Sequence, residues 1–167
     1  LLERARQLPA VDLLCPAALE TAEPLAGNGW RVRLNDGREF TTRLLVGADG
    51  AQSRVRQLAG IQTGGWSYDQ HAVVANVRTA ETHQETAWQR FLPTGPLAIL
   101  PLHDGRCSIV WSTTPDQADS LLALDERDFG VALAETFDQR LGAIVEVGPR
   151  AAFPLRLQHA HAYVQPG

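Results

Sequence analysis

Four residues at fixed spacing carry the clearest chemical signal in this chain. The stretch LLVGADGAQSRVR, residues 44–56, begins as an apolar run and then presents Asp49, Gly50, Ser53 and Arg56. A buried strand that ends in a tight glycine turn brings a carboxylate and backbone N–H groups to a sheet edge, where open α/β sheets bind nucleotides. Gly50 permits a positive φ or close backbone approach, and Arg56 offers a planar fork of donors to a phosphate or a carboxylate.

Each of these residues also has a purely structural interpretation. Asp49 either orients cofactor groups or caps the next helix. Arg56 either binds a pyrophosphate or holds Asp49 in an ion pair. Ser53 is expected to be a local backbone partner rather than a catalyst.

The composition is that of an ordinary globular protein. The 167 residues are 44% hydrophobic and 20% charged, with a net charge of −4, which argues against a nucleic-acid partner. The two cysteines, Cys15 and Cys107, form no CxxC pair and are expected to be free thiols. No apolar run approaches the roughly 20 residues of a membrane helix. The five histidines share no metal-ligand spacing, so no metal is expected.

The chain contains no methionine, and its first residues are those of a helix interior. We therefore expect it to be a piece of a longer protein.

Hydrophobic periodicity and turn residues predict an α+β fold, with hairpin turns at Asn35-Asp36-Gly37 and at His103-Asp104-Gly105. The expected helices are 1–8, 53–59, a stretch from Pro115 and 125–141, and the expected strands are 11–15, 29–34, 38–43, 44–47, 71–78, 87–92, 96–102, 106–113, 144–147 and 150–157. Residues 61–70 are predicted to form a loop where the composition shifts.

Several segments together resemble the class A FAD-dependent aromatic hydroxylases. The Asp-Gly motif lies within VGADGAQSRVRQLAGI, and the likeness continues through GWSYDQHAVVANV, TAWQRFLPTGPLAILPL, CSIVWS, AFPL and HAHAYVQPG. These stretches are most similar to the ubiquinone-biosynthesis branch. The resemblance implies part of a Rossmann-like FAD-binding domain at 1–62, an antiparallel substrate-binding sheet at 63–157, and a return toward the FAD domain at 158–167.

The resemblance also implies an activity. A flavin reduced by NAD(P)H would use O₂ to hydroxylate a polyprenylated benzoquinol, with Asp49, Gly50, Ser53 and Arg56 near the cofactor. Phe91, Leu100, Pro101 and Trp111 are candidates for the substrate pocket, although apolar side chains at such positions mostly fill cores. No catalytic residue is identified.

Two further FAD motifs of the family do not occur in the chain. There is no GxGxxG segment near its start, and the later Gly-Asp motif would begin just after Gly167. The chain by itself is therefore expected to bind FAD weakly and to be inactive.

Two other functions remain open at this point. One is a related flavin hydroxylase of a soluble phenolic compound, and the other is a non-catalytic domain that packs within a homo-oligomer or a biosynthetic complex. The expected location is cytoplasmic, with peripheral attachment to the inner membrane as a further option.

Overall fold

The computed structural model describes residues 2–166, which form two compact units. Unit 1 contains the chain up to Gly64 together with the segment from Gln158, and unit 2 is the continuous stretch Gly65–Leu157. Strands β4 (Thr63–Thr79) and β9 (Ala151–Ala160) both run through a boundary between the units. The α+β class is confirmed.

Unit 1 is built on a three-stranded antiparallel meander. Its strands are β1 (Leu19–Pro24), β2 (Trp30–Leu34) and β3 (Glu39–Thr42), in that order. The predicted hairpin turn between β2 and β3 is present: the Leu34 N–H donates to the Arg38 carbonyl at 2.9 Å, and Gly37 has a φ of 85°. Glycine at that position gives this positive φ without a steric penalty.

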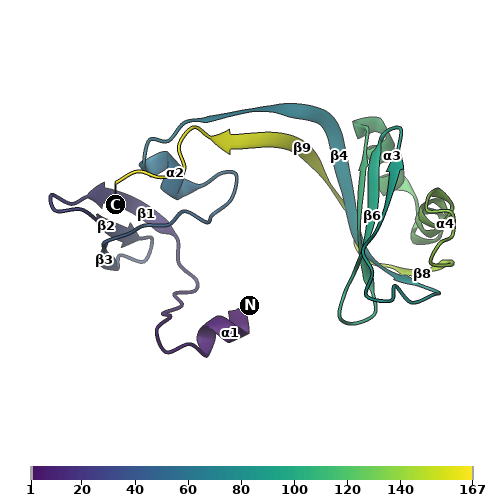
Figure 1. Cartoon of the computed structure of the whole chain (residues 1–167), viewed down its shortest axis with the longest axis horizontal. Coiled ribbons are helices and arrows are strands. Elements are labelled where there is room, and N and C mark those ends of the chain that lie inside the picture. The colour runs from purple at the N-terminus through teal and green to yellow at the C-terminus, as the bar shows by residue number, and fades with distance from the viewer. Residues whose placement is uncertain (1, 167) are drawn as a thin grey trace. The chain divides into compact units, whose positions relative to one another are not determined.

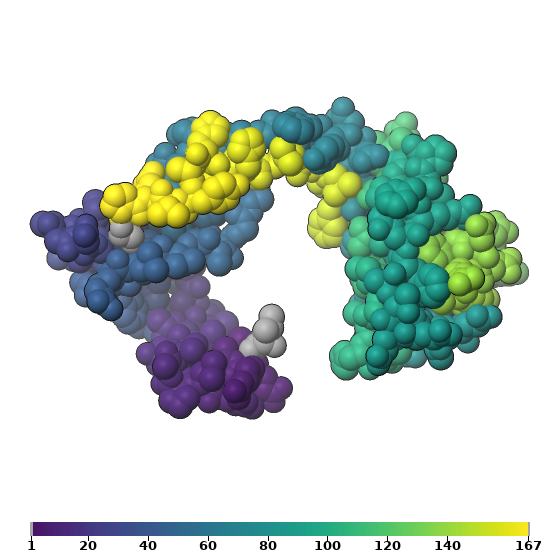
Figure 2. All heavy atoms as spheres, viewed as in Figure 1, coloured from purple at the N-terminus to yellow at the C-terminus, as the bar shows by residue number. Residues whose placement is uncertain are grey.

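Two short helices and the C-terminal segment complete unit 1. Helix α1 spans Leu2–Arg6, and α2 spans Arg54–Leu58. The C-terminal segment lies against the residues that precede β4, and the His161 N–H donates to the Gln62 carbonyl at 2.9 Å. In Figure 2 the C-terminal segment is seen as yellow atoms lying on blue ones.

Two predicted strands of unit 1 are wrong. Residues 11–15 and 44–47 form no strand, and within 44–47 Leu44 and Val46 are 65% and 70% exposed. No strand among residues 2–166 pairs with 44–47, so the backbone there has no ladder of hydrogen bonds and its apolar side chains have no partner surface. Apolar composition alone therefore predicted a buried strand that these residues do not form.

Unit 2 is dominated by an antiparallel sheet. The strand order is β5-β6-β7-β4-β8, and β9 pairs with β4 (Figure 1). The strands not yet bounded are β5 (Trp88–Leu92), β6 (Gly95–Pro101), β7 (Cys107–Thr113) and β8 (Ile144–Val147). All four short strands were expected within one or two residues, and the Asp-Gly turn at 104–105 joins β6 to β7 as predicted.

Three boundaries in and beside this sheet differ from expectation. The predicted loop 61–70 is wrong because β4 begins at Thr63, and β9 extends to Ala160 instead of 157. Helix α4 spans Glu126–Thr136 and not 125–141, because Asp138 and Gln139 both have a φ of 52°. Such values cannot continue a right-handed helix.

The core of unit 2 lies between one face of the sheet and two helices. Helix α3 (Pro115–Ala123) is capped by Thr114, and α4 is capped by Asp125, whose carboxylate accepts the Asp128 N–H at 2.7 Å. The strand residues that face the helices alternate with residues that face away. The largest side chains of this core that are almost fully buried are Phe129, Leu97, Ile99, Ile109, Leu133, Val73 and Val77.

The opposite face of the sheet carries no helix of unit 2. Cross-strand neighbours on β6, β7 and β4 line this face. One row is Leu100, Ser108 and Asn76, and the next is Ala98, Val110 and Val74. We call this surface the open face. Most of its side chains are small or apolar, and they are exposed or half-buried.

Candidate functional site

The turn at residues 49–56 is a closed network of hydrogen bonds around the carboxylate of Asp49. One oxygen accepts a hydrogen bond from the Ser53 hydroxyl, and the other accepts the backbone N–H groups of Arg54 at 2.6 Å and Val55 at 3.2 Å. Ser53 is the N-cap of α2, and its oxygen accepts the Arg56 N–H at 3.0 Å. Together the two side chains satisfy three N–H groups at the start of the helix, which otherwise lack partners.

These bonds lower the pKa of Asp49. The hydrogen bond from Ser53 contributes most, and the N–H groups of Val55 and Arg54 act in the same direction. A carboxylate that accepts hydrogen bonds is favoured in its charged form. Asp49 is therefore a fixed negative charge at this turn.

Two glycines allow the turn to close. Gly50 has a φ of 79°, as the sequence predicted. A Cβ at Gly47 would lie 3.0 Å from Cβ of Val55 and 3.3 Å from the Ser53 oxygen, so α2 packs directly on the Gly47 backbone. The helix is also tied to the meander, since Arg54 Nη2 donates to the Glu20 carbonyl of β1 at 3.1 Å.

Arg56 does not form the ion pair with Asp49 that was one of its two interpretations. Its Nη1 donates instead to the Ala51 carbonyl at 2.8 Å, and no ion pair joins the two side chains. The N–H groups of Arg54 and Val55 and the Ser53 hydroxyl hold Asp49 in place. Asp49 thus accepts hydrogen bonds from the start of α2, as its capping interpretation requires, and Ser53 makes the local backbone bond that was expected.

The four candidates for the substrate pocket lie on the sheet of unit 2 but not on one surface. Phe91 on β5 is 81% exposed and Leu100 on β6 is 39% exposed, and both point to the open face. Trp111 on β7 is 2% exposed and packs in the core. Pro101 pairs with the buried Cys107 and alternates with Leu100, which places it on the core side.

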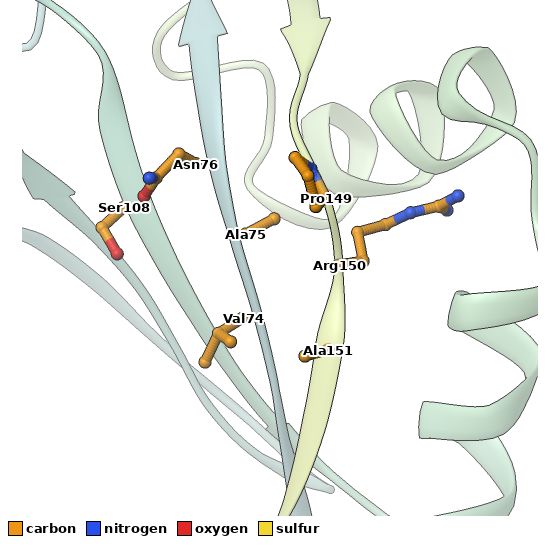
Figure 3. Close-up of a pocket in the computed structure, with 7 residues that line it drawn as sticks. All are labelled: Val74, Ala75, Asn76, Ser108, Pro149, Arg150 and Ala151. Atoms are coloured by element: carbon orange, nitrogen blue, oxygen red, sulfur yellow. The ribbon is translucent and has the colours of Figure 1, made fainter.

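A cavity of about 230 Å³ opens where β4 separates from the segment before β9. Figure 3 shows Val74, Asn76 and Ser108 on one side of the sheet, while the Arg150 side chain extends the other way, toward the helices. The complete lining is Val74, Ala75, Asn76, Ser108, Pro149, Arg150 and Ala151. No pattern in the sequence pointed to this cavity, because Asn76 and Ser108 meet only through the pairing of β4 with β7.

The comparisons with known proteins decide the family. Residues 23–165 match the family described as FAD binding domain. The chain belongs to that family. The FAD-binding-domain chain is also 42% identical over 164 residues to the ubiquinone hydroxylase UbiL of Rhodospirillum rubrum, which covers 98% of the chain and 38% of UbiL.

Two more relatives have related names. The ubiquinone biosynthesis monooxygenase COQ6 of Mus musculus, named as mitochondrial, is 38% identical over 94% of the chain and 40% of its own length. The 3-demethoxyubiquinol 3-hydroxylase of Escherichia coli is 38% identical over 81% of the chain and 34% of its own length. The FAD-binding-domain chain thus spans about two fifths of the curated relatives it matches.

Solved structures share the fold of this FAD-binding-domain chain. PqsL of Pseudomonas aeruginosa, described as a probable FAD-dependent monooxygenase, superposes with a TM-score of 0.64 at 28% identity, covering 87% of the chain and 39% of PqsL. The p-nitrophenol 4-monooxygenase PnpA of Pseudomonas putida reaches a TM-score of 0.71 at 17% identity, covering 98% of the chain and 42% of PnpA. At that identity PnpA supports the fold alone.

The turn leaves few N–H groups of α2 free for a phosphate. Asp49 and Ser53 already use the N–H groups of Arg54, Val55 and Arg56, and α2 is only five residues long. The two longer helices of residues 2–166 begin at side-chain caps rather than glycine-rich turns. The charged fork of Arg56, anchored through one nitrogen, is the one group of the motif suited to an anionic cofactor.

Within residues 2–166 no group of three or more His, Cys, Asp or Glu side chains could hold a metal ion. His159 and His161 lie with ring centroids 6.0 Å apart, without a third ligand. No helix in the described part of the chain is both long and apolar enough to cross a bilayer.

Proposed function

We propose that this chain is part of an FAD-dependent monooxygenase that hydroxylates a polyprenylated benzoquinol in ubiquinone biosynthesis. The observation that carries the proposal is the 42% identity with a ubiquinone hydroxylase along 98% of the chain. The activity is assigned to the whole protein, since the chain spans about two fifths of its relatives.

The proposed reaction consumes one O₂ and one NAD(P)H for each ring hydroxylated. One oxygen atom replaces a ring hydrogen as a hydroxyl group, and the other leaves as water when NAD(P)H supplies a hydride and the medium a proton. Bound FAD supplies the redox chemistry that activates O₂, and the protein orients the ring and excludes water.

We assign unit 1, which contains the turn, to the FAD-binding part of the protein. Asp49, Gly50 and Ser53 hold the turn in one conformation, and Arg56 directs its remaining N–H groups to an anionic part of the cofactor. This assignment follows the predicted domains 1–62 and 158–167, and it rests on the closed hydrogen-bond network around Asp49.

We assign unit 2, within the predicted domain 63–157, to the substrate. Phe91 and Leu100 on the open face form part of the pocket wall, while Trp111 and Pro101 support that wall from the core side. An apolar wall suits a ring with a hydrocarbon tail. This favours the polyprenylated quinol over a soluble phenolic compound, which would need more polar contacts.

The motif around 88–96 resembles octaprenyl-methyl-methoxy-benzoquinol hydroxylase, and we propose that the whole protein hydroxylates the same kind of ring. UbiL and COQ6 are at least as similar to the chain as the enzyme of Escherichia coli. The structure of the product decides among them.

The test uses the full-length gene product. Flavin absorbance is measured, followed by NAD(P)H oxidation with a short-chain demethoxyubiquinol analogue and mass spectrometry of the product. A yellow protein with substrate-stimulated oxidation and a product heavier by one oxygen supports the proposal. A colourless protein, or oxidation without a hydroxylated product, contradicts it and leaves the interaction-domain alternative.

The chain expressed alone provides a second comparison. We expect it to bind FAD weakly and to be inactive, because the described residues offer no phosphate-binding helix start. A stoichiometric yellow complex would contradict this. Attachment to a membrane surface and assembly into an oligomer or complex also stay proposals, tested by vesicle flotation and by light scattering of the full-length protein.

A further inference from the structure

The cavity beside β4 has a polar pair whose nearest cross-strand neighbours are apolar. Asn76 and Ser108 occupy directly opposite positions of β4 and β7, so their side chains are neighbours on the open face. The rows around them carry Leu100, Val110 and Val74. Neither polar side chain makes a hydrogen bond within the described residues, so both can bind a ligand.

The cavity offers no available positive charge. The guanidinium of Arg150 lies 4.9 Å from the ring centre of Phe129, and its Nη1 is within 3.2 Å of the Leu121 carbonyl and 3.4 Å of the Asp125 carbonyl. Arg78, two residues beyond Asn76 on the same strand, is paired with Glu146 at 3.2 Å. An aromatic carboxylate bound here would therefore find no free guanidinium as a partner.

The size of the cavity limits what it can hold. Its volume of about 230 Å³ is smaller than the roughly 300–1,000 Å³ of sites that enclose drug-sized ligands. It has room for a substituted ring but not for a long tail, which would have to extend along the apolar open face.

We infer that Asn76 and Ser108 hydrogen-bond the oxygen substituents of an uncharged quinol ring and thereby select it over aromatic acids. The amide offers two donors and an acceptor, and the hydroxyl offers one donor and two lone pairs. These donors and acceptors can form hydrogen bonds with the hydroxyl and methoxy oxygens of the ring. This inference rests on the proposed function and names the residues of its substrate site that choose the ring.

The test uses the full-length, flavin-loaded protein with two quinol analogues and an acid. One analogue has a ring methoxy group, the second has hydrogen there, and 4-hydroxybenzoate is the acid. The variants are Asn76→Leu and Ser108→Ala. Gln89→Leu is the matched control, because Gln89 is an exposed polar residue of the same face on the outermost strand, β5.

A neutral hydrogen bond contributes about 0.5–1.5 kcal/mol, which corresponds to a change of roughly 2- to 10-fold. For Asn76→Leu and Ser108→Ala we expect kcat/KM to fall by this factor on the methoxy analogue and by less on the analogue without it. Gln89→Leu should keep the parent's ratio of kcat/KM on the two analogues. The unmodified enzyme should not turn over 4-hydroxybenzoate.

Three results would overturn the inference. They are equal losses on both analogues, no loss in either variant, and turnover of the acid at a rate comparable to the quinol. If the unmodified enzyme holds no flavin or makes no product, the proposed function itself fails, which is a different outcome. Flavin content per chain checks folding, and Asn76→Ser replaces Asn76→Leu if the larger change lowers it.

Discussion

Replacing Ser53 with alanine tests whether one hydroxyl holds the turn at 49–56 together. The hydroxyl donates to Asp49 and accepts the Arg56 N–H at 3.0 Å, so the substitution removes both bonds. Loss of an N-cap costs about 1 kcal/mol. Loss of the hydrogen bond to the exposed carboxylate of Asp49 costs about 1.5 kcal/mol, the lower end of the range for a charged partner. We expect the free energy of opening the turn to fall by about 2–3 kcal/mol.

The measurement is amide hydrogen exchange of residues 50–60 in the full-length protein, followed by mass spectrometry. At about 1.4 kcal/mol for each factor of ten, exchange at the start of α2 should accelerate roughly 30- to 150-fold. Gln52→Ala is the control, because Gln52 is exposed and lies in the same turn. Exchange that does not differ between the two variants would refute the reasoning.

The same substitution should change the titration of Asp49. Its pKa is lowered chiefly by Ser53, so the alanine variant should raise the pKa toward the ordinary value of about 3.9. A folded-state pKa below the unfolded one means that the stabilisation is complete above about pH 4 and is lost as the pH falls through the folded value. An unchanged carboxyl titration in the nuclear magnetic resonance spectrum would contradict the assignment.

Three other predictions concern unit 2. Gly95→Ala should destabilise the β5–β6 hairpin by more than about 2 kcal/mol in urea unfolding. Gly95 has a φ of 141°, and a Cβ there would lie 2.7 Å from the Ser112 carbonyl oxygen. A urea midpoint unchanged from the parent would contradict this. A thiol reagent should modify the exposed Cys15 quickly and Cys107 only on unfolding, since Cys107 is buried and burial raises its pKa; equal rates would count against the described burial. Hydrogen bonds from Arg106 lower the pKa of Asp104 to about 2. The hydrogen bond between the two side chains should therefore persist to low pH and be lost as the pH falls through about 2, as a carboxyl titration would show.

The sequence predicted those elements correctly whose hydrogen-bond partners lie within a few residues of one another. The Asn35-Asp36-Gly37 and Asp104-Gly105 turns, the strands beside them and the caps of α3 and α4 depend on hydrogen bonds within a few residues. Short strand-like runs between turn residues then identified β5, β6 and β7. Each of these elements is determined by sequence neighbours.

The predictions failed where a residue's partner is distant in the sequence or where the described residues offer none. The run at 44–47 looks like a buried strand but has no neighbouring strand, and β4 starts early although Gly64 and Gly65 suggested a loop. The bonds of Asp49 required the folded turn, because spacing alone could not distinguish Arg56 from Ser53 as its partner. Trp111 could not be assigned to a face of the sheet until the register of β7 was known.

The interruption of unit 1 by unit 2 sets the order in which the chain can fold during synthesis. Unit 2 is one continuous segment, so all of its strands and both of its helices are available once residue 157 has left the ribosome. Unit 1 needs residues from both sides of that segment, including the contact of His161 with Gln62. Domains generally fold as units in the order in which they are completed. Unit 2 can therefore form first, and unit 1 is completed only after the residues that follow unit 2 have been synthesised.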